Sequence, residues 1–174
     1  HAVGEEKTKR YQTALQSLIK QRSGHELSTL ATHQLARYQF SEGDYTEAHR
    51  LASRAVKTFP DSMGARMCQE LIYRIEDKES RIQIERIWNA PWPQMEITYR
   101  NLNTVYFRAV AWNWQESVQR EGRSPDQLDD REREALLQQK PAREWSASLK
   151  PTADFRLRTE KLPVPENLKP GFYF

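Results

Sequence analysis

The chain has 174 residues, of which 37% are hydrophobic and 29% are charged, a composition that suits one or two small globular domains. Its 27 Lys and Arg residues are interspersed with 24 Asp and Glu residues, and the formal net charge is only +3. A nucleic-acid-binding surface would concentrate positive charge, so the composition disfavours that class of protein. The single cysteine, Cys68, excludes an intramolecular disulfide and a metal site built from several cysteines.

In the first half of the chain, apolar residues recur at helical spacing and predict four helices. The first helix is expected over residues 5–21 and the second over residues 27–43. The third is the clearest, because apolar residues follow the three-four spacing over residues 48–59 and a proline then ends the helix. Either Asp61 or Ser62 can cap the fourth helix. Its predicted buried side carries Cys68, Leu71, Ile72 and Ile75.

The second and third helices are predicted to be antiparallel neighbours, because only the short loop over residues 42–45 separates them. Their pattern resembles one tetratricopeptide-type repeat, although Gln39 stands where a large apolar residue is usual and Phe40 is its substitute. We therefore expect a four-helix, repeat-like domain over residues 1–79. The residues that carry the resemblance are Leu35, Ala36, Gly43, Asp44, Tyr45, Ala48, Ala55 and Pro60.

Two interpretations of this helical domain stay open. Tetratricopeptide arrays often bind peptides in a concave groove, and on that interpretation Tyr38 and Tyr45 are candidate protein-contact residues. The alternative, which we favour, is a structural pair of hairpins that packs on its neighbour, because a groove lined by so few repeats is small.

Near Arg81 the hydrophobic period changes from helical to alternating, which predicts strands. Ile82 and Ile84 alternate with polar residues and predict a half-buried first strand. Residues 89–93 contain two prolines and are expected to form a loop. The second strand is predicted from Met95, Ile97 and Tyr99.

A tight turn is expected at residues 101–103, since Asn tolerates a positive φ. The third strand is predicted to be the longest, over residues 104–114, with apolar residues on both faces, so both faces should be at least partly covered. The residues on one face are Val105, Phe107, Ala109 and Ala111, and those on the other are Tyr106, Val110, Trp112 and Trp114.

A polar helical insertion is then expected over residues 124–139, with Ser124 as its cap. The fourth strand alternates cleanly, and residues 172–174 are expected to begin a sixth strand. Because three aromatic residues would be costly to leave exposed there, we expect the chain to be truncated inside its β domain. The inward residues are predicted to be Trp145, Ala147 and Leu149 in the fourth strand and Phe155, Leu157 and Thr159 in the fifth.

These elements predict an α+β protein with two domains. The helical repeat-like domain over residues 1–79 is followed by an antiparallel β-sandwich over residues 80–174, which carries the helical insertion near residues 124–139.

The β half resembles the macroglobulin-like domain of bacterial alpha-2-macroglobulin family proteins, in particular the helix-preceded forms of Bacteroidetes type. The resemblance covers roughly residues 82–174 and lies in the order and spacing of several segments. The helical part also fits these long forms, although less specifically. The segments that carry the resemblance of the β half are residues 99–108, Trp145, Asp154-Phe155, Leu162-Pro163 and residues 168–173.

The resemblance implies a part of a periplasmic, cell-surface or secreted endopeptidase inhibitor that traps proteases. Its implied partners are proteases, through the parent protein, and adjoining macroglobulin domains, with membrane association only through a lipid anchor on the parent. In many members a Cys-Gly-Glu-Gln thioester couples to the protease. Cys68 is followed by Gln69-Glu70-Leu71 and sits on a helical face, so we interpret it as a small buried hydrophobe.

No residue set in the sequence predicts an active site, a cofactor site or a metal site, and we expect a protein that is not an enzyme. His33 and His49 could approach each other between helices, but without a placed carboxylate they make a poor zinc site. Five tryptophans raise the possibility of stacking on sugars, although most are expected in the core. Trp92, between two prolines, is expected to be the most exposed and is the third candidate protein-contact residue.

Overall fold

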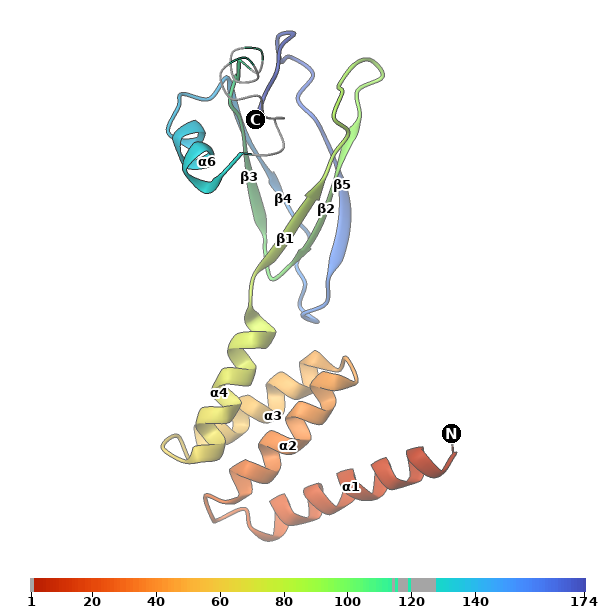
Figure 1. Ribbon diagram of the computed structural model, residues 1–174. Coiled ribbons are helices and arrows are strands. Elements are labelled where there is room, and N and C mark those ends of the chain that lie inside the picture. The colour runs from red at the N-terminus through yellow and green to blue at the C-terminus, as the bar shows by residue number, and fades with distance from the viewer. Residues whose placement is uncertain (1, 114, 116–118, 120–127) are drawn as a thin grey trace. The chain divides into compact units, whose positions relative to one another are not determined.

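The computed structural model describes residues 2–113, 115, 119 and 128–174, with side chains described from residue 6 onward. In this part of the chain, four helices precede antiparallel strands arranged in two small sheets, as the α+β prediction requires (Figure 1). The chain folds as two units. The helical unit contains residues 1–80, 99–101 and 152–158, and the strand unit contains residues 81–98, 102–151 and 159–174. The domain limits expected at residues 79 and 80 stay a prediction.

The four predicted helices are present as α1 (Ala2–Gln21), α2 (Ser28–Ser41), α3 (Tyr45–Thr58) and α4 (Met63–Glu76). Asp44 caps α3, since its carboxylate accepts a hydrogen bond from the Glu47 N–H at 3.1 Å. Of the two candidate caps for α4, Ser62 has this role, and its hydroxyl accepts from the Ala65 N–H at 3.2 Å.

The core of the helical unit is formed by apolar residues of α2, α3 and α4, and Leu15 and Ile19 of α1 are partly buried against it. The four apolar residues expected on the inner side of α4 are all buried. Phe40 packs against this core from its edge, in agreement with its predicted place beside Gln39. The buried cluster consists of Leu35, Ala36, Ala48, Leu51, Ala52, Ala55, Cys68, Leu71, Ile72 and Ile75.

Gly64 marks a close approach of α4 to α2 that the sequence pattern did not predict. A Cβ atom at this position would lie within 3 Å of Thr29 and of the Leu30 backbone nitrogen. The hydroxyls of Thr29 and Ser62 are hydrogen-bonded at 3.0 Å in the same buried place. The beginnings of the two helices therefore touch through backbone and small polar groups.

The strands are β1 (Glu79–Gln83), β2 (Gln94–Arg100), β3 (Thr104–Ala109), β4 (Arg143–Ser148) and β5 (Arg158–Pro163). One sheet has the order β1-β2-β5, and the other consists of β3 and β4. These last two strands are antiparallel, with Phe107 opposite Trp145. The aromatic rings of this pair are stacked with centroids 5.0 Å apart, so Trp145 lies on the inner face as predicted.

The second strand is confirmed, because Met95, Ile97 and Tyr99 on β2 are all buried. The first strand forms, but the prediction that it is half-buried is wrong. Every residue of β1 is exposed, and Ile82 and Ile84 are 51% and 37% exposed. Alternation predicts the extended backbone correctly, whereas burial depends on a covering layer that β1 lacks among the described residues.

The third strand is shorter than predicted, and one of its faces is less covered. β3 ends at Ala109, and Trp114 lies outside the described residues. Phe107 and Ala109 are buried as expected, but Tyr106 on the other face is 81% exposed. Arg108 interrupts that face and binds Glu144 across the sheet at 2.9 Å, so this face is open to water within β3. Val110, which was predicted on the same face and follows β3, is fully buried, so the expected covering is present there.

The fifth strand begins later than predicted and turns its other face inward. β5 starts at Arg158, whereas Phe155 lies in the preceding loop with a φ of 57°. Leu157 is 53% exposed, while Leu162 is half-buried. Within β5 the partly buried residues are Glu160 and Leu162, so the covered face carries the even-numbered residues, whereas alternation predicted Phe155, Leu157 and Thr159 there.

The helical insertion is present as α6 (Asp130–Leu137), anchored by the buried Leu136. Asp129 forms a reciprocal capping box with Glu132, so α6 begins later than the predicted helix. The expected cap at Ser124 lies outside the described residues.

The last three residues pair with the segment after β3 through an isolated antiparallel bridge between Ala111 and Tyr173, so the expected start of a sixth strand is present only as this bridge. Val110 and Phe174 exchange two backbone hydrogen bonds, each of 2.9 Å, and the Trp112 N–H donates to the Phe172 carbonyl at 3.0 Å.

Candidate functional site

The three predicted protein-contact residues fall on both units. Tyr38 lies on α2 and Tyr45 begins α3 in the helical unit, whereas Trp92 lies in the loop before β2 in the strand unit. Each of the three side chains is half-buried. The half-burial of Trp92 does not support the expectation that it is the most exposed tryptophan.

The two tyrosines have different surroundings. The Tyr45 ring packs edge-on against Phe40, with centroids 5.2 Å apart, and belongs to the border of the helical core. Partial burial and the Glu42 carboxylate raise the pKa of Tyr38 above its ordinary value, so its hydroxyl stays a neutral donor. The Tyr38 hydroxyl is thus engaged with Glu42, as the Tyr45 ring is with Phe40.

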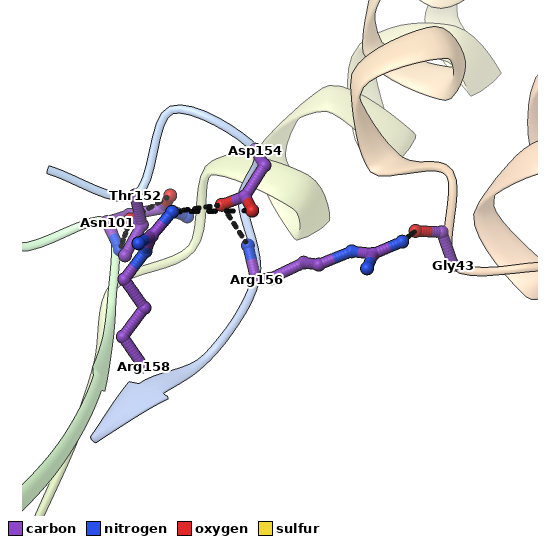
Figure 2. A network of polar contacts seen from close by, with 6 residues as sticks. All are labelled: Gly43, Asn101, Thr152, Asp154, Arg156 and Arg158. Atoms are coloured by element: carbon purple, nitrogen blue, oxygen red, sulfur yellow. Dashed lines mark hydrogen bonds and ion pairs between the residues drawn. The ribbon is translucent and has the colours of Figure 1, made fainter.

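A set of polar contacts in the helical unit involves Asn101 and Thr152 and, in the loop that follows Thr152, Asp154, Arg156 and Arg158 (Figure 2). Sequence reasoning predicted Asn101 only as a turn residue. Asn101 has a φ of 57°, as expected for this turn. Its side-chain amide donates to the carbonyl oxygens of Ile75 and Asp77 at 2.8 and 2.9 Å. Its backbone N–H donates to the Thr152 hydroxyl at 2.8 Å. Asn101 therefore satisfies the orphan carbonyls at the end of α4.

The second part of the network is the loop over residues 152–158. The Asp154 carboxylate accepts from the Arg156 N–H at 3.3 Å and from the Arg158 guanidinium at 3.4 Å. These bonds lower the pKa of Asp154 below its ordinary value. The Arg156 side chain in turn donates to the Gly43 carbonyl at 3.1 Å, at the turn between α2 and α3 (Figure 2).

Phe155 adds an apolar contact to the same loop. Its ring stacks on the His49 imidazole, with centroids 4.9 Å apart and planes inclined by 22°. The other side of this histidine is fixed by Glu76, whose carboxylate lies 2.7 Å from His49 Nε2. A positive φ is unusual for a bulky residue, so this contact holds the backbone in a conformation that Phe seldom adopts.

Sequence reasoning missed this loop because it assigned Phe155 to a strand by alternation. The available signal was local: Pro151 and the polar residues after it favour a turn, and an Asp commonly accepts the N–H two residues later. The contacts with His49 and Gly43, more than 100 positions earlier, could not be deduced from the local pattern.

The histidines and the cysteine considered as candidate metal or thiol groups lie in the helical unit. In the described part of the chain, no group of three or more His, Cys, Asp and Glu side chains could hold a metal ion. Cys68 is fully buried, and burial raises the pKa of its thiol to about 11, so it is a neutral core residue. His33 is buried on α2, while His49 is engaged with Glu76.

No protein-family model, curated protein or solved structure was found that matches the chain. Within the described residues, no helix is both long enough and apolar enough to cross a lipid bilayer.

Proposed function

We propose that this chain is a non-catalytic structural and interaction segment of a bacterial alpha-2-macroglobulin-like endopeptidase inhibitor, with a tetratricopeptide-like helical part and a macroglobulin-like sandwich. The proposal rests on the family resemblance of the β half and on one structural observation. Two short segments from that half, residues 99–101 and 152–158, are built into the helical unit. Such sharing suits a segment that holds a chain of domains together.

The shared segments stabilise the helical unit at defined points. Asn101 binds the last carbonyls of α4, and Phe155 packs against His49 on α3. Arg156 binds the turn before α3. A module evolved to bind a peptide on its own would be expected to complete its core from its own helices, so these contacts favour a structural role.

The strand unit supports the same proposal only through the arrangement of its strands. Its strands are antiparallel, and residues 172–174 pair with the segment after β3. In the proposed family, the segment that resembles residues 168–173 leads into a late strand of the sandwich. The buried, neutral Cys68 thiol agrees with a chain that contributes no thioester of its own.

The proposed partners are proteases, which the parent protein would bind, and adjoining macroglobulin domains. The proposed location is the periplasm or the cell surface. Both follow from the resemblance. The direct test is to read the gene that encodes this segment in both directions. Further macroglobulin-like domains and a bait segment in the same reading frame are expected, and a reading frame without any further sandwich domain would contradict the proposal.

A second candidate function is a tetratricopeptide-like peptide-binding module of a secreted or surface protein. The observation that favours it is the tyrosine content of adjacent helices: Tyr38 is half-buried on α2, and Tyr73 on α4 is 65% exposed. If the whole chain selects peptides from a library, Tyr38→Ala and Tyr45→Ala should weaken the binding. Tyr11→Ala, at a side chain of α1 that is 50% exposed, is the control and should leave it unchanged.

A further inference from the structure

Strand β1 forms one edge of the three-stranded sheet. The order β1-β2-β5 leaves the outer side of β1 without a partner strand among the described residues. All five residues of the strand are exposed, and residues 84–87 directly after it are exposed as well. An exposed edge offers a row of backbone N–H and C=O groups to another extended chain.

Prolines, bulges and charged side chains, especially lysine, commonly blunt the edge of a sheet. Residues 79–85, which comprise β1 and the two residues after it, carry charged side chains but contain no proline and no lysine. Here Ile82 and Ile84 are 51% and 37% exposed, and they alternate with Arg81, Gln83 and Glu85. The segment thus combines β-branched residues, which favour pairing, with charges of opposite sign at its two ends.

We propose that residues 81–85, which are the last three residues of β1 and the two residues that follow it, bind the same residues of a second copy of the chain, with the two segments antiparallel and centred on Gln83. In this register, Ile82 of one copy lies opposite Ile84 of the other, and Gln83 lies opposite its own counterpart. Arg81 lies opposite Glu85. Twofold symmetry repeats each contact, so the interface contains two Ile–Ile pairs and two Arg–Glu pairs.

The charges select this register over its neighbours. Centring the pair on Ile82 would place Glu79 opposite Glu85, which repel each other. Centring it on Ile84 would place Ile82 opposite Arg86. Directly opposed side chains on one face of an antiparallel pair interact most strongly, and like charges there are destabilising. Of these three registers, only the one centred on Gln83 matches apolar with apolar residues and positive with negative residues.

The test measures the oligomeric state of the 174-residue chain by sedimentation velocity and native mass spectrometry over a range of concentrations. A monomer–dimer equilibrium is expected. Arg81→Glu replaces both Arg–Glu pairs by Glu–Glu pairs, and Glu85→Arg replaces both by Arg–Arg pairs. Each variant should raise the dimer dissociation constant at least about tenfold.

Mixing the two variants provides the sharpest measurement. Arg81→Glu and Glu85→Arg restore opposite charges when they face each other, so the mixture should form a heterodimer that neither variant forms with itself. The doubly substituted chain should also regain self-association. Arg22→Glu, an exposed residue on the helical unit, makes the same change of net charge as Arg81→Glu and should leave the dimer unchanged.

Three results would overturn the proposal. The first is a chain that stays monomeric up to its limit of solubility. The second is a dimer that Arg81→Glu does not weaken. The third is a mixture of the two charge variants that contains no heterodimer, which would refute the register. Circular dichroism spectra of all variants must match the parent, and Ile82→Thr, which keeps a β-branched residue, offers a second variant that should weaken the dimer.

Discussion

In the helical unit, apolar side chains from α2, α3 and α4 meet in one buried cluster, although Leu27, Met63 and Tyr73 of this unit stay in contact with water, as several apolar side chains of the strand unit do. Ile75 in the first unit and Ile97 in the second are both fully buried, but Ile87 and Tyr106 in the second are 75% and 81% exposed. Helices that pack against one another bury a whole stripe, while a small sheet buries only the face that another layer covers.

The two units also differ in their spectroscopic signals, which allows the comparison to be tested. All five tryptophans belong to the strand unit, and most of the helical residues belong to the helical unit. Tryptophan fluorescence therefore reports on the strand unit, and far-ultraviolet circular dichroism reports mainly on the helices.

The largest expected effects come from truncating one core residue in each unit. Ile75→Ala and Ile97→Ala should each reduce the free energy of unfolding by about 2–5 kcal/mol, because each leaves a cavity at a fully buried position. In urea titrations, the first should shift mainly the circular dichroism midpoint and the second mainly the fluorescence midpoint. Ile87→Ala is the control and should shift neither. A fluorescence midpoint unchanged by Ile97→Ala would show that the strand unit does not depend on this core position.

Gly64→Ala should have the next largest effect. It should lower the free energy of unfolding, whereas helix propensity alone predicts an increase. In an exposed helix, Gly→Ala stabilises by about 1 kcal/mol. At Gly64, the added Cβ would overlap Thr29 and the Leu30 backbone, so we expect a loss of about 1–3 kcal/mol. Thermal unfolding followed at the helix signal measures it.

Gly24 provides the matched control for this substitution. A Cβ atom at Gly24 would meet no heavy atom within 4 Å, so Gly24→Ala should be neutral or slightly stabilising. If Gly64→Ala proved as harmless as Gly24→Ala, the close approach of α4 to α2 would be wrong.

Asn101→Gly should lower the free energy of unfolding by about 1–2 kcal/mol, since it removes two side-chain hydrogen bonds to the carbonyls of Ile75 and Asp77. Glycine keeps the positive φ, so the substitution isolates the role of the amide. Hydrogen exchange should rise in the last turn of α4. Asn103→Gly in the same turn is the control, and equal effects of the two substitutions would contradict the capping role.

These positions also show how far the sequence could predict the structure. Helices α2 to α4, the cap at Ser62 and the buried face of β2 follow from local periodicity and local hydrogen-bonding chemistry. The exposure of Ile82 could not be predicted, because it depends on whether a second layer covers the edge strand. The same holds for Gly64, where a distant helix determines the need for a glycine.

The loop over residues 152–158 shows the limit most clearly. Alternation assigned Phe155 to a strand, and the structure places it in a loop against His49. The period of two is a property of the local chain, whereas the contact joins residues far apart in sequence. The helical positions of Tyr38 and Tyr45 could be predicted from the sequence, whereas their half-burial and the polar contacts of Asn101 depend on the fold.

The smallest expected effect is a pH dependence confined to the helical unit. Burial, followed by the nearby Arg37 guanidinium, lowers the pKa of His33 below its ordinary value of 6.5, and the weaker influence of Glu70 opposes this shift. His33 is 5% exposed, and its Nδ1 atom has no hydrogen-bond partner. The unfolded chain therefore binds a proton at His33 more readily than the folded chain does.

Stability should accordingly fall as the pH is lowered from 6.5 towards the depressed folded pKa, and it should be insensitive to this group at higher pH. The measurement is the circular dichroism midpoint in urea at a series of pH values. His33→Gln should flatten the slope in this window, while His25→Gln, at an exposed site, should not. Because His33 lies in the helical unit, the fluorescence midpoint of the strand unit should show no matching dependence, and a slope unaltered by His33→Gln would assign the effect to another group.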